Sequence, residues 1–347
     1  MRRLVPLLAE PEPAFVDALR RAWDDGDAVL PLDPRLPAPA ADALMGAMRV
    51  DDPVDAGDAL VVATSGTTGD PNGAVLTHES LRASAIATTS RLGVDLSADR
   101  WLSVLPLAHI GGLSVITRSL LTGTSLTFDP DDPAATLVSM VATQVRRTDV
   151  SRFRVVVVGG SAPPADLPPN VVTTYGMTET GSGVVYDGVP LDGVEVRIVG
   201  DELQLRGPML LRAYRDGTDP KDGDGWLPTG DAGEVAAGGR VVVHGRIAEV
   251  IVTGGEKVWP DPVEAALRTV DGVADVAVAG VPDDEWGHRV VAFVVAGDTI
   301  PTLDALRNAV KAVLPAYAAP KQLVLVDALP RTAIGKVQRG MLVSRRL

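Results

Sequence analysis

The chain has 347 residues, a net charge of −13 and no cysteine. Its length suits one large domain followed by a smaller one. The lack of cysteine excludes disulfides, thiolate metal sites and cysteine nucleophiles. Four scattered histidines also argue against a zinc site. Because a strongly acidic protein repels long polyanions, we expect no nucleic-acid partner.

No apolar run approaches the roughly 18 residues that a membrane span needs. The N-terminus resembles a signal peptide only faintly, since Glu10 and Pro11 interrupt its short apolar stretch. We therefore expect a cytoplasmic protein without a membrane span. The sequence leaves the oligomeric state open, with a homodimer as one alternative.

The first part of the chain alternates short β-like runs with helix-like ones. We expect strands at 59–64, 101–105, 125–128 and 154–158, and helices at 78–92, 111–121 and 134–146. Strands that alternate with helices of this length favour βαβ units and a parallel or mixed sheet.

From residue 193 onward the pattern changes to short alternating runs between Asp-Gly, Gly-Asp and Gly-Gly turns, which is typical of antiparallel β structure. A compact α+β segment follows, with strands expected at 249–253, 273–281, 289–296 and 322–327 and helices at 262–270 and 303–314. We predict a large α/β N-terminal domain over 1–246, including a small antiparallel β subdomain. A small mobile α+β C-terminal domain is predicted over 247–347.

A loop rich in Gly and Thr directly follows the strand expected at 59–64. Its sequence, TSGTTGDPNG over 64–73, has three glycines that permit tight turns and hydroxyls that can donate to phosphate oxygens. It is not a Walker A loop, because the G-x-x-x-x-G-K-[ST] pattern is absent. Taken alone, the stretch is explained better as an ordinary surface turn.

Further motifs follow this loop along the chain, and together they resemble those of the adenylate-forming superfamily of acyl-CoA synthetases, non-ribosomal adenylation domains and luciferases. Six motifs occur in that superfamily's order, SGTTG at 65–69, GGS at 159–161, YGMTET at 175–180, TGD at 229–231, GR…GGE at 245–256 and PRTAIGK at 330–336. Each motif is moderately specific, and six in order make coincidence negligible. The resemblance implies the two-domain adenylate-forming fold. It also implies ATP, Mg²⁺, coenzyme A and a small carboxylic acid as partners.

Within the superfamily, the chain is most similar to the short o-succinylbenzoate–CoA ligases of menaquinone biosynthesis in actinobacteria. Only 64 residues precede the phosphate loop, fewer than in most members, and segments 105–121, 185–194 and 285–295 are similar to that subfamily. This implies a two-step reaction in which a carboxylate becomes an acyl-adenylate and then a thioester.

The resemblance also assigns roles to single residues. Those implied for ATP binding are Ser65, Gly66, Thr67, Thr68, Gly69, Gly159, Gly160, Ser161, Tyr175, Gly176, Met177, Thr178, Asp231 and Arg246. Among them, Tyr175 would offer a flat face to adenine. Asp231 would accept hydrogen bonds from the ribose hydroxyls, assisted by Arg246. The catalytic Glu179 would hold Mg²⁺, a hard cation that carboxylates and phosphates bind together.

Lys336 is implied as the catalytic lysine of adenylation, where a cation would bridge the carboxylate and the α-phosphate as charge builds up. In the superfamily the small domain then rotates and presents a glycine-rich loop to the thiol. Here that loop is Gly254, Gly255, Glu256 and Lys257, which would bind CoA. The hinge is expected at Ala248.

The acid-binding residues are expected along the apolar helix that follows His109. Arg118 is the only charged residue of that helix, and a cation in apolar surroundings needs a partner. A structural salt bridge explains it nearly as well as a substrate carboxylate. In the substrate interpretation, His109 and Arg118 line one pocket, and the aryl ring lies against Gly111 and Gly112.

Two positions depart from the family pattern. Asn72 stands where the phosphate loop usually carries lysine, and Ala248 replaces the usual Asp or Lys of the hinge. We expect an active enzyme with weaker ATP binding. Three alternatives stay open: another aryl- or acyl-CoA synthetase, an adenylation enzyme that loads a carrier protein, and a non-catalytic nucleotide-binding homologue.

Overall fold

The computed structural model describes the whole chain except residues 65–70, 146, 161–166, 332–336 and 345–347. It divides into two compact units. The N-terminal unit comprises 1–197, 204–228 and 235–241, and the C-terminal unit comprises 198–203, 229–234 and 242–347. Segments from both sides of residue 246 thus belong to the C-terminal unit, and the domain boundary expected there stays a prediction.

The helices of the described chain include two short ones, α5 and α8, and three 3₁₀ turns. They are α1 (Pro13–Asp24), α2 (Ala38–Ala47), α3 (His78–Arg91), α4 (Ile110–Thr122), α5 (Ala142–Val145), η1 (Thr178–Thr180), η2 (Ile247–Glu249), α6 (Pro260–Leu267), α7 (Leu303–Val313), η3 (Ala316–Ala318) and α8 (Arg339–Ser344).

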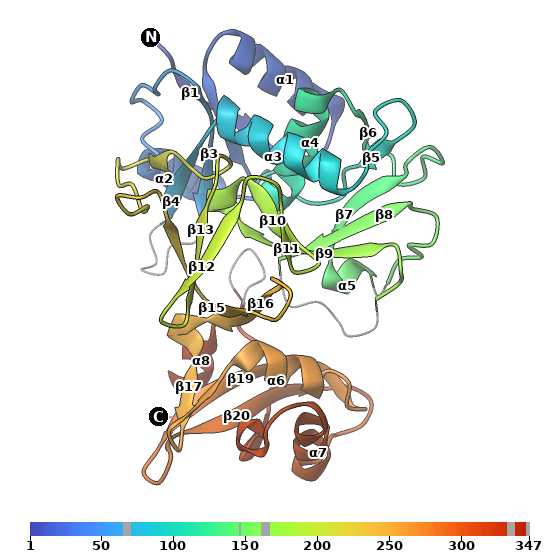
Figure 1. Cartoon of the computed structure of the whole chain (residues 1–347), viewed down its shortest axis with the longest axis vertical. Helices are drawn as coiled ribbons and strands as arrows, with labels where there is room; N and C mark the ends of the chain where they lie inside the picture. Colours follow the sequence, from blue (N-terminus) through green and yellow to red (C-terminus); the bar gives the residue numbers. More distant parts are fainter. Residues whose placement is uncertain (65–70, 146, 161–166, 332–336, 345–347) are drawn as a thin grey trace. The chain divides into compact units, whose positions relative to one another are not determined.

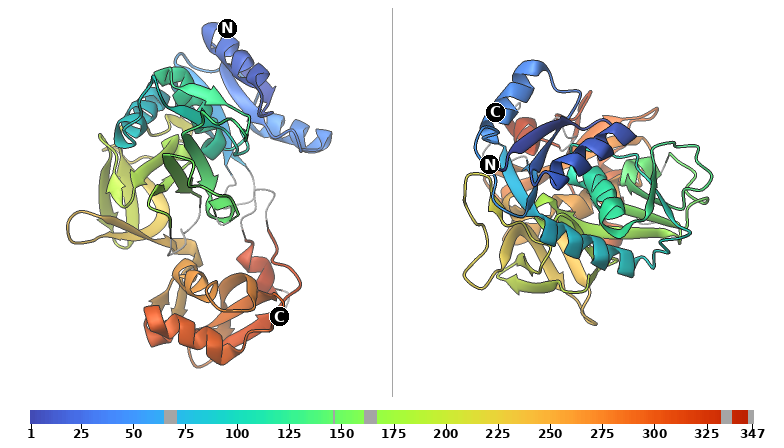
Figure 2. Two further views of the ribbon diagram at one scale, coloured as in Figure 1. Left: turned by 90° about the vertical axis from the view of Figure 1, so that its right-hand side faces the viewer. Right: turned by 90° about the horizontal axis from the view of Figure 1, so that it is seen from above.

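The first sheet has the strand order β1-β2-β3-β4-β14. Its strands are β1 (Leu4–Leu8), β2 (Ala28–Leu32), β3 (Asp58–Thr64), β4 (Asn72–Thr77) and β14 (Ala213–Tyr214). The first three run parallel, whereas β4 is antiparallel to both of its neighbours. Helix α1 packs against β1 and β2 (Figure 2). The glycine-rich loop therefore joins an antiparallel pair, and β4 is a strand that the sequence did not predict.

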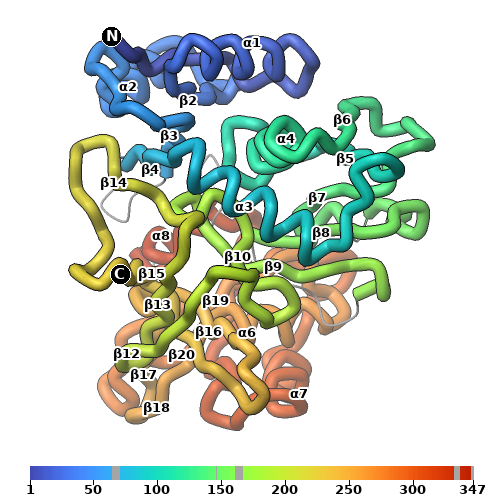
Figure 3. Tube along the Cα trace, turned by 45° about the horizontal axis from the view of Figure 1, so that its top comes forward, coloured from blue at the N-terminus to red at the C-terminus, as the bar shows by residue number. Residues whose placement is uncertain are grey.

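The second sheet has the order β11-β10-β9-β8-β7-β5-β6. Its strands are β5 (Arg100–Leu102), β6 (Ser125–Thr127), β7 (Leu137–Val141), β8 (Val155–Gly159), β9 (Val171–Met177), β10 (Ser182–Tyr186) and β11 (Val189–Pro190). From β9 to β6 all pairs are parallel. Helices α3 and α4 match the helices expected at 78–92 and 111–121, and they pack side by side (Figure 3). A capping box between Thr77 and Ser80 begins α3.

The helix predicted at 134–146 is wrong. Residues 137–141 form β7, a strand between β5 and β8, and only 142–145 are helical. The first four residues of β7 are buried. A central parallel strand is covered on both faces and reads as a continuous apolar run, which periodicity cannot distinguish from a buried helix.

A buried carboxylate links three strands of this sheet where they begin. Asp99, just before β5, accepts hydrogen bonds from Thr136 Oγ1 at 2.7 Å and from Arg154 Nε at 3.0 Å. Thr136 precedes β7 and Arg154 precedes β8. Burial opposes ionisation of Asp99, but the hydrogen bonds from Arg154 and Thr136 prevail and lower its pKa.

Replacing Asp99 with asparagine should lower the free energy of unfolding near neutral pH by about 1–3 kcal/mol. A carboxylate with a depressed folded-state pKa contributes stability above its unfolded pKa of about 4, and this is lost as the pH falls through the folded-state pKa. The free energy of unfolding, measured by urea denaturation from neutral pH down to about pH 2, should therefore vary less with pH for Asp99→Asn than for the unaltered protein. Asp131→Asn, at an exposed position, is the control. Equal pH dependence of Asp99→Asn and the unaltered protein would contradict the assignment.

A third sheet has the order β12-β13-β15-β16. Its strands are β12 (Glu195–Val199), β13 (Glu202–Arg206), β15 (Leu227–Val235) and β16 (Val241–Arg246). Three of these match the short alternating runs expected after residue 193, and β15 is additional.

The C-terminal sheet has the order β18-β17-β20-β19, with β21 paired to β20. Figure 1 labels its strands β17, β19 and β20. Its strands are β17 (Ile251–Thr253), β18 (Glu256–Val258), β19 (Val273–Asp283), β20 (Gly287–Ala296) and β21 (Gln322–Leu325). Alternate residues of β19 enter two apolar clusters: Val276 and Val278 pack with residues of α6 and α7, and Ala277 and Ala279 pack with Leu342 of α8. Both faces of the sheet are thus covered, and the α+β pattern predicted here is confirmed.

No helix in the described ranges has the length and apolar character needed to cross a membrane.

Candidate active site

The second sheet brings Gly159, Gly160 and Tyr175 together at the carboxyl ends of its parallel strands β8 and β9. β8 ends at Gly159, and its parallel neighbour β9 carries Tyr175 two residues beyond the Val158–Thr173 pairing. A Cβ at position 159 would lie 2.7 Å from Thr174 Oγ1, so this approach of the strands needs glycine. Gly160 has a φ of +85°. Ligands of open α/β sheets bind at the carboxyl ends of parallel strands, which is where these residues lie.

The next motif residues form the turn from β9 into η1. A Cβ at Gly176 would come within 2.2 Å of the Ser182 carbonyl oxygen. Thr180 Oγ1 accepts a hydrogen bond from the Met177 N–H at 2.9 Å and lies 2.6 Å from the Ser182 oxygen, to which it donates. The backbone on both sides of Thr178 and Glu179 is therefore fixed, and these two side chains are half-buried.

Tyr214 holds Glu179, a contact that sequence reasoning missed. Its hydroxyl donates to Glu179 Oε1 at 2.9 Å across 35 residues of chain. The other carboxylate oxygen of Glu179 has no hydrogen-bond partner within the described ranges. A Mg²⁺ bound to nucleotide takes one or two carboxylates and fills its other positions with phosphate oxygens and water. Glu179 fits that role, and the described residues contain no cluster of three or more acidic or histidine side chains able to hold a metal alone.

The TGD motif and its arginine lie together in the C-terminal unit. Gly230 has a φ of +70°, which turns the chain between Thr229 and Asp231. Arg246 Nε lies 3.0 Å from Asp231 Oδ1, and Arg246 Nη1 donates to the Thr229 carbonyl at 3.0 Å. Asp231 is 6% exposed. The arginine thus fixes the orientation of the carboxylate that is predicted to accept the ribose hydroxyls.

Arg118 is a buried cation with unused donors. It is 3% exposed, and its Nη2 donates to Ser182 Oγ at 3.2 Å. The guanidinium carbon lies 4.9 Å from the centre of the Trp101 ring. Burial lowers the pKa of Arg118, although a guanidinium stays protonated in proteins. The structural salt bridge considered for this residue is absent, because no carboxylate in the described part of the chain pairs with it.

Two further buried donors lie in the chain at and just after β5. Among the described residues, no hydrogen-bond partner is found for Arg118 Nε and Nη1, for the indole nitrogen of Trp101, whose ring the guanidinium overlies, or for the Ser103 hydroxyl. Ser103 is two residues from Trp101 and follows the end of β5 at Leu102. Buried polar groups in folded proteins are almost always paired. Within the described ranges, the buried donors of Arg118 and Trp101 therefore lack an acceptor, and neither Trp101 nor Ser103 belonged to any sequence motif.

His109 was expected to share a pocket with Arg118. It is the N-cap of α4, nine positions before Arg118. Its backbone is extended, with φ −114° and ψ 148°, so helical periodicity does not set the direction of its side chain relative to that of Arg118. The shared pocket and a role of His109 toward substrate stay predictions.

The adjacent glycines of α4 differ in their surroundings. A Cβ at Gly112 would lie 2.4 Å from the Pro106 oxygen and 2.6 Å from the Leu105 oxygen, both backbone atoms. A Cβ at Gly111 would meet only Leu105 Cδ1, at 3.6 Å. Close packing of α4 on the preceding turn explains glycine at 112, whereas nothing steric requires it at 111. Their proposed contact with an aryl ring stays a prediction.

This difference gives a matched pair of variants. Gly112→Ala should lower the free energy of unfolding by about 2–4 kcal/mol, because backbone must move to admit the methyl group. Gly111→Ala should be neutral or stabilise by up to about 1 kcal/mol, since alanine favours helix. Chemical denaturation of both variants checks this, and similar midpoints would contradict the packing described for Gly112.

The loop predicted to face CoA is a hairpin between β17 and β18. Gly254 and Gly255 have φ values of +59° and +86°, and the residues from Gly254 to Lys257 are exposed. A Cβ at Gly254 would lie 2.8 Å from the Trp286 ring, so this glycine also permits close packing. Lys257 forms an ion pair with Asp201. The predicted hinge, Ala248, is exposed in η2 between β16 and β17.

Some predicted site residues lie outside the described residues, namely Ser65, Gly66, Thr67, Thr68, Gly69, Ser161 and Lys336. The residues on either side of two of these segments are described by the structure. Residues 65–70 join β3 to β4 beside the Thr64–Asn72 pair, and 332–336 lie between Arg331 and Val337, which form an antiparallel bridge.

A sheet edge suited to a nucleotide, an acidic side chain suited to Mg²⁺ and a small α+β domain with a glycine-rich hairpin define a nucleotide-dependent acid-activating enzyme. The model of the AMP-binding enzyme family matches residues 16–245, and that of the AMP-binding enzyme C-terminal domain matches 262–336. The chain belongs to the AMP-binding enzyme family, and the resemblance stated from the motifs is confirmed.

Several relatives are named as ligases or synthetases that join 2-succinylbenzoate (o-succinylbenzoate) to CoA. A probable 2-succinylbenzoate–CoA ligase of Mycobacterium tuberculosis is 42% identical over 342 residues, covering 88% of each chain. The o-succinylbenzoate CoA synthetase of Bacillus subtilis in complex with the acyl-adenylate intermediate OSB-AMP is 27% identical, with a TM-score of 0.76 over 97% of this chain and 82% of that one. A structure of the same synthetase with ATP and magnesium ion gives 26% identity and a TM-score of 0.74, covering 98% of this chain and 84% of that one.

Proposed function

We propose that this protein is an ATP-dependent 2-succinylbenzoate–CoA ligase that acts in menaquinone biosynthesis, as a cytoplasmic enzyme. The similarity to ligases of that name supports the reaction class and the pathway. The observation in this chain that carries the choice of acid is the buried Arg118, whose Nε and Nη1 have no hydrogen-bond partner among the described residues. 2-Succinylbenzoate has two carboxylates, so one can be activated while the other needs a fixed cation.

The first half-reaction joins the acid to AMP. A carboxylate oxygen attacks the α-phosphorus of ATP, the bond to the β-phosphate oxygen breaks, and pyrophosphate leaves. Two anions must meet, so the site has to neutralise charge and hold the reacting atoms in line. We assign Glu179, held by Tyr214, to Mg²⁺ binding. The loop 65–69 is assigned to the phosphates, and Lys336 to the developing charge between carboxylate and α-phosphate.

Recognition of the nucleoside is assigned to two further groups. Gly159, Gly160 and Tyr175 at the sheet edge would receive adenine between backbone and ring. Asp231, oriented by Arg246, would accept the ribose hydroxyls. Each assignment rests on the family motif, and the hydrogen bond and ion pair that hold Arg246 beside Asp231 support the assignment of the ribose acceptor.

In the second half-reaction the CoA thiol attacks the acyl carbonyl of the adenylate, and AMP leaves with the pair of electrons of the broken C–O bond. The residues assigned to CoA are Gly254, Gly255, Glu256 and Lys257. Their exposed hairpin allows close approach of the pantetheine arm to backbone. Rotation about Ala248 would exchange this loop for Lys336 between the half-reactions.

A panel of acids tests the choice of substrate. The protein is incubated with ATP, Mg²⁺ and CoA plus 2-succinylbenzoate, benzoate or a fatty acid, and the thioesters are measured by mass spectrometry. We expect 2-succinylbenzoate to be converted with the highest kcat/KM. Equal conversion of the monocarboxylic acids would favour a general aryl- or acyl-CoA synthetase. Transfer to a phosphopantetheinyl carrier protein but not to CoA would favour a carrier-loading enzyme.

A further inference from the structure

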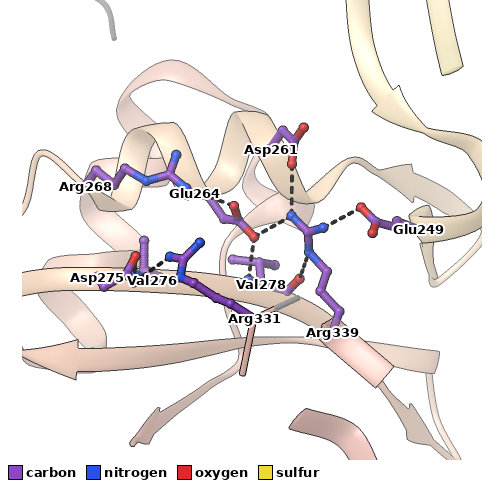
Figure 4. Close-up of polar contacts among 9 residues, drawn as sticks. All are labelled: Glu249, Asp261, Glu264, Arg268, Asp275, Val276, Val278, Arg331 and Arg339. Carbon is purple, nitrogen blue, oxygen red and sulfur yellow. Dashed lines mark hydrogen bonds and ion pairs between the residues drawn. The ribbon is translucent and has the colours of Figure 1, made fainter. Parts of the chain in front are cut away.

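One arginine of the C-terminal unit joins three separate parts of the chain. Arg339 forms ion pairs with Glu249 in η2 and, at 2.9 Å and 2.8 Å, with Asp261 and Glu264 in α6 (Figure 4). Its Nε donates to the Val278 carbonyl of β19 at 3.1 Å. All three guanidinium nitrogens are therefore used, and the side chain is 16% exposed.

The cluster is built on a buried carboxylate. Glu264 is 3% exposed, and its Oε1 accepts from Arg339 and from the Val278 N–H at 2.8 Å. Its Oε2 accepts from Arg268 Nη2 at 3.0 Å. Arg268 is the C-cap residue of α6. Its ion pair is with Glu264 and involves neither Glu249 nor the chain around Lys336. It therefore offers a control that disturbs the same buried carboxylate from another side.

Arg339 lies close in the sequence to the predicted catalytic lysine, and its partner Glu249 lies close to the predicted hinge. Arg339 is three residues beyond Lys336, and Glu249 is one residue beyond Ala248. On the other side of Lys336, Arg331 pairs with Asp275 of β19 at 2.6 Å. The bridge from Arg331 to Val337 and the hydrogen bond from Gln338 N to Pro330 O at 2.8 Å join the two flanks.

We propose that Arg339 is a positioning residue, which fixes the chain that carries Lys336 to α6 and to the first residues after the hinge. Rotation at Ala248 then moves Lys336 with the rest of the small domain, because Glu249, α6, β19 and the chain after Lys336 are held in one body. A lysine whose flanking residues are loosely held would reach the α-phosphate in few of its conformations, whereas fixed flanks restrict the positions it can take. This inference rests on the proposed roles of Lys336 and Ala248.

The inference predicts an effect on one half-reaction. Arg339→Gln should slow ATP–pyrophosphate exchange about 10- to 100-fold. Thioester formation from isolated acyl-adenylate and CoA should change far less. Arg268→Gln, which unpairs the same Glu264, should leave the ratio of the two rates unchanged. Folding of each variant is checked by circular dichroism and by its unfolding midpoint. An equal fall in both half-reactions for Arg339→Gln, or no fall in either, would overturn the proposal.

Two further variants keep the test decisive if Arg339→Gln does not fold. Glu249 is 33% exposed and Arg331 is 41% exposed, so Glu249→Gln and Arg331→Gln should retain the fold. Each should slow pyrophosphate exchange selectively, and a folded pair with unchanged exchange would contradict the clamp.

The combination with Lys336→Ala separates this inference from the proposed function. If Arg339 acts through Lys336, then Arg339→Gln should not slow pyrophosphate exchange further in a Lys336→Ala background. Multiplied losses in the double variant would refute action through Lys336. Unchanged exchange in Lys336→Ala alone would instead refute the role proposed for the lysine, whatever the behaviour of Arg339.

Discussion

Replacing Arg118 with methionine should make the protein more stable and nearly inactive toward 2-succinylbenzoate. A buried guanidinium without a carboxylate partner costs desolvation free energy, and an apolar side chain of similar length removes that cost. We expect the free energy of unfolding to rise by about 1–4 kcal/mol. The value of kcat/KM should fall about 100-fold or more, because the second carboxylate loses its cation.

The two effects are measured on the same variant by chemical denaturation and by the thioester assay. Ser182→Ala is the matched control, since it removes the neutral partner of Arg118 and keeps the cation. Activity toward benzoate in Arg118→Met should stay close to that of the unaltered protein. Loss of stability in Arg118→Met, or equal loss of activity on both acids, would show that the arginine is structural.

Replacing Lys336 with alanine should slow adenylation strongly and leave the second step intact. The cation is expected to meet charge that develops only as the carboxylate attacks the α-phosphorus, so its removal should slow pyrophosphate exchange about 100- to 1,000-fold. Thioester formation from isolated acyl-adenylate should proceed at nearly the unaltered rate.

Lys257→Ala provides the opposite case. Lys257 is exposed beside the glycine hairpin assigned to CoA, so its loss should weaken CoA binding and leave exchange unchanged. A Lys336→Ala variant that retains exchange, or that loses both half-reactions in proportion, would contradict the division of labour between the two lysines.

Local patterns were sufficient for much of the fold. Strand β3, helices α3 and α4 and nearly the whole C-terminal sheet were predicted near their observed bounds, because their periodicity and flanking turns agree. The strand β7 was taken for a helix, since burial on both faces removes the alternation that identifies a strand. The short strand β4 was missed because the only turn signal near it is the glycine-rich loop that precedes it.

Candidate site residues could be assigned from the sequence where a motif is local, whereas contacts between distant residues could not be predicted. The motifs assigned Gly159, Tyr175, Asp231 and Arg246 to the site, and their roles stay predictions. Tyr214 binds Glu179 across 35 residues, and Ser182 meets Arg118 across 64, so no spacing rule indicates either pair.

The Arg339 cluster shows the same limit in the C-terminal unit. Its three acidic partners lie between 75 and 90 residues away in the chain. In the sequence, Arg339 is one basic residue in a polar tail, and only the packing of α8 against β19 reveals its contacts with Glu249 and α6.

The most direct test of the whole account is ATP–pyrophosphate exchange by the unaltered protein in the presence of Mg²⁺ and 2-succinylbenzoate. The account predicts exchange that depends on the acid and does not require CoA, together with an acyl-adenylate detectable by mass spectrometry. Binding of ATP without exchange, for 2-succinylbenzoate and for every other aryl acid tried, would contradict acid activation and favour a non-catalytic nucleotide-binding homologue.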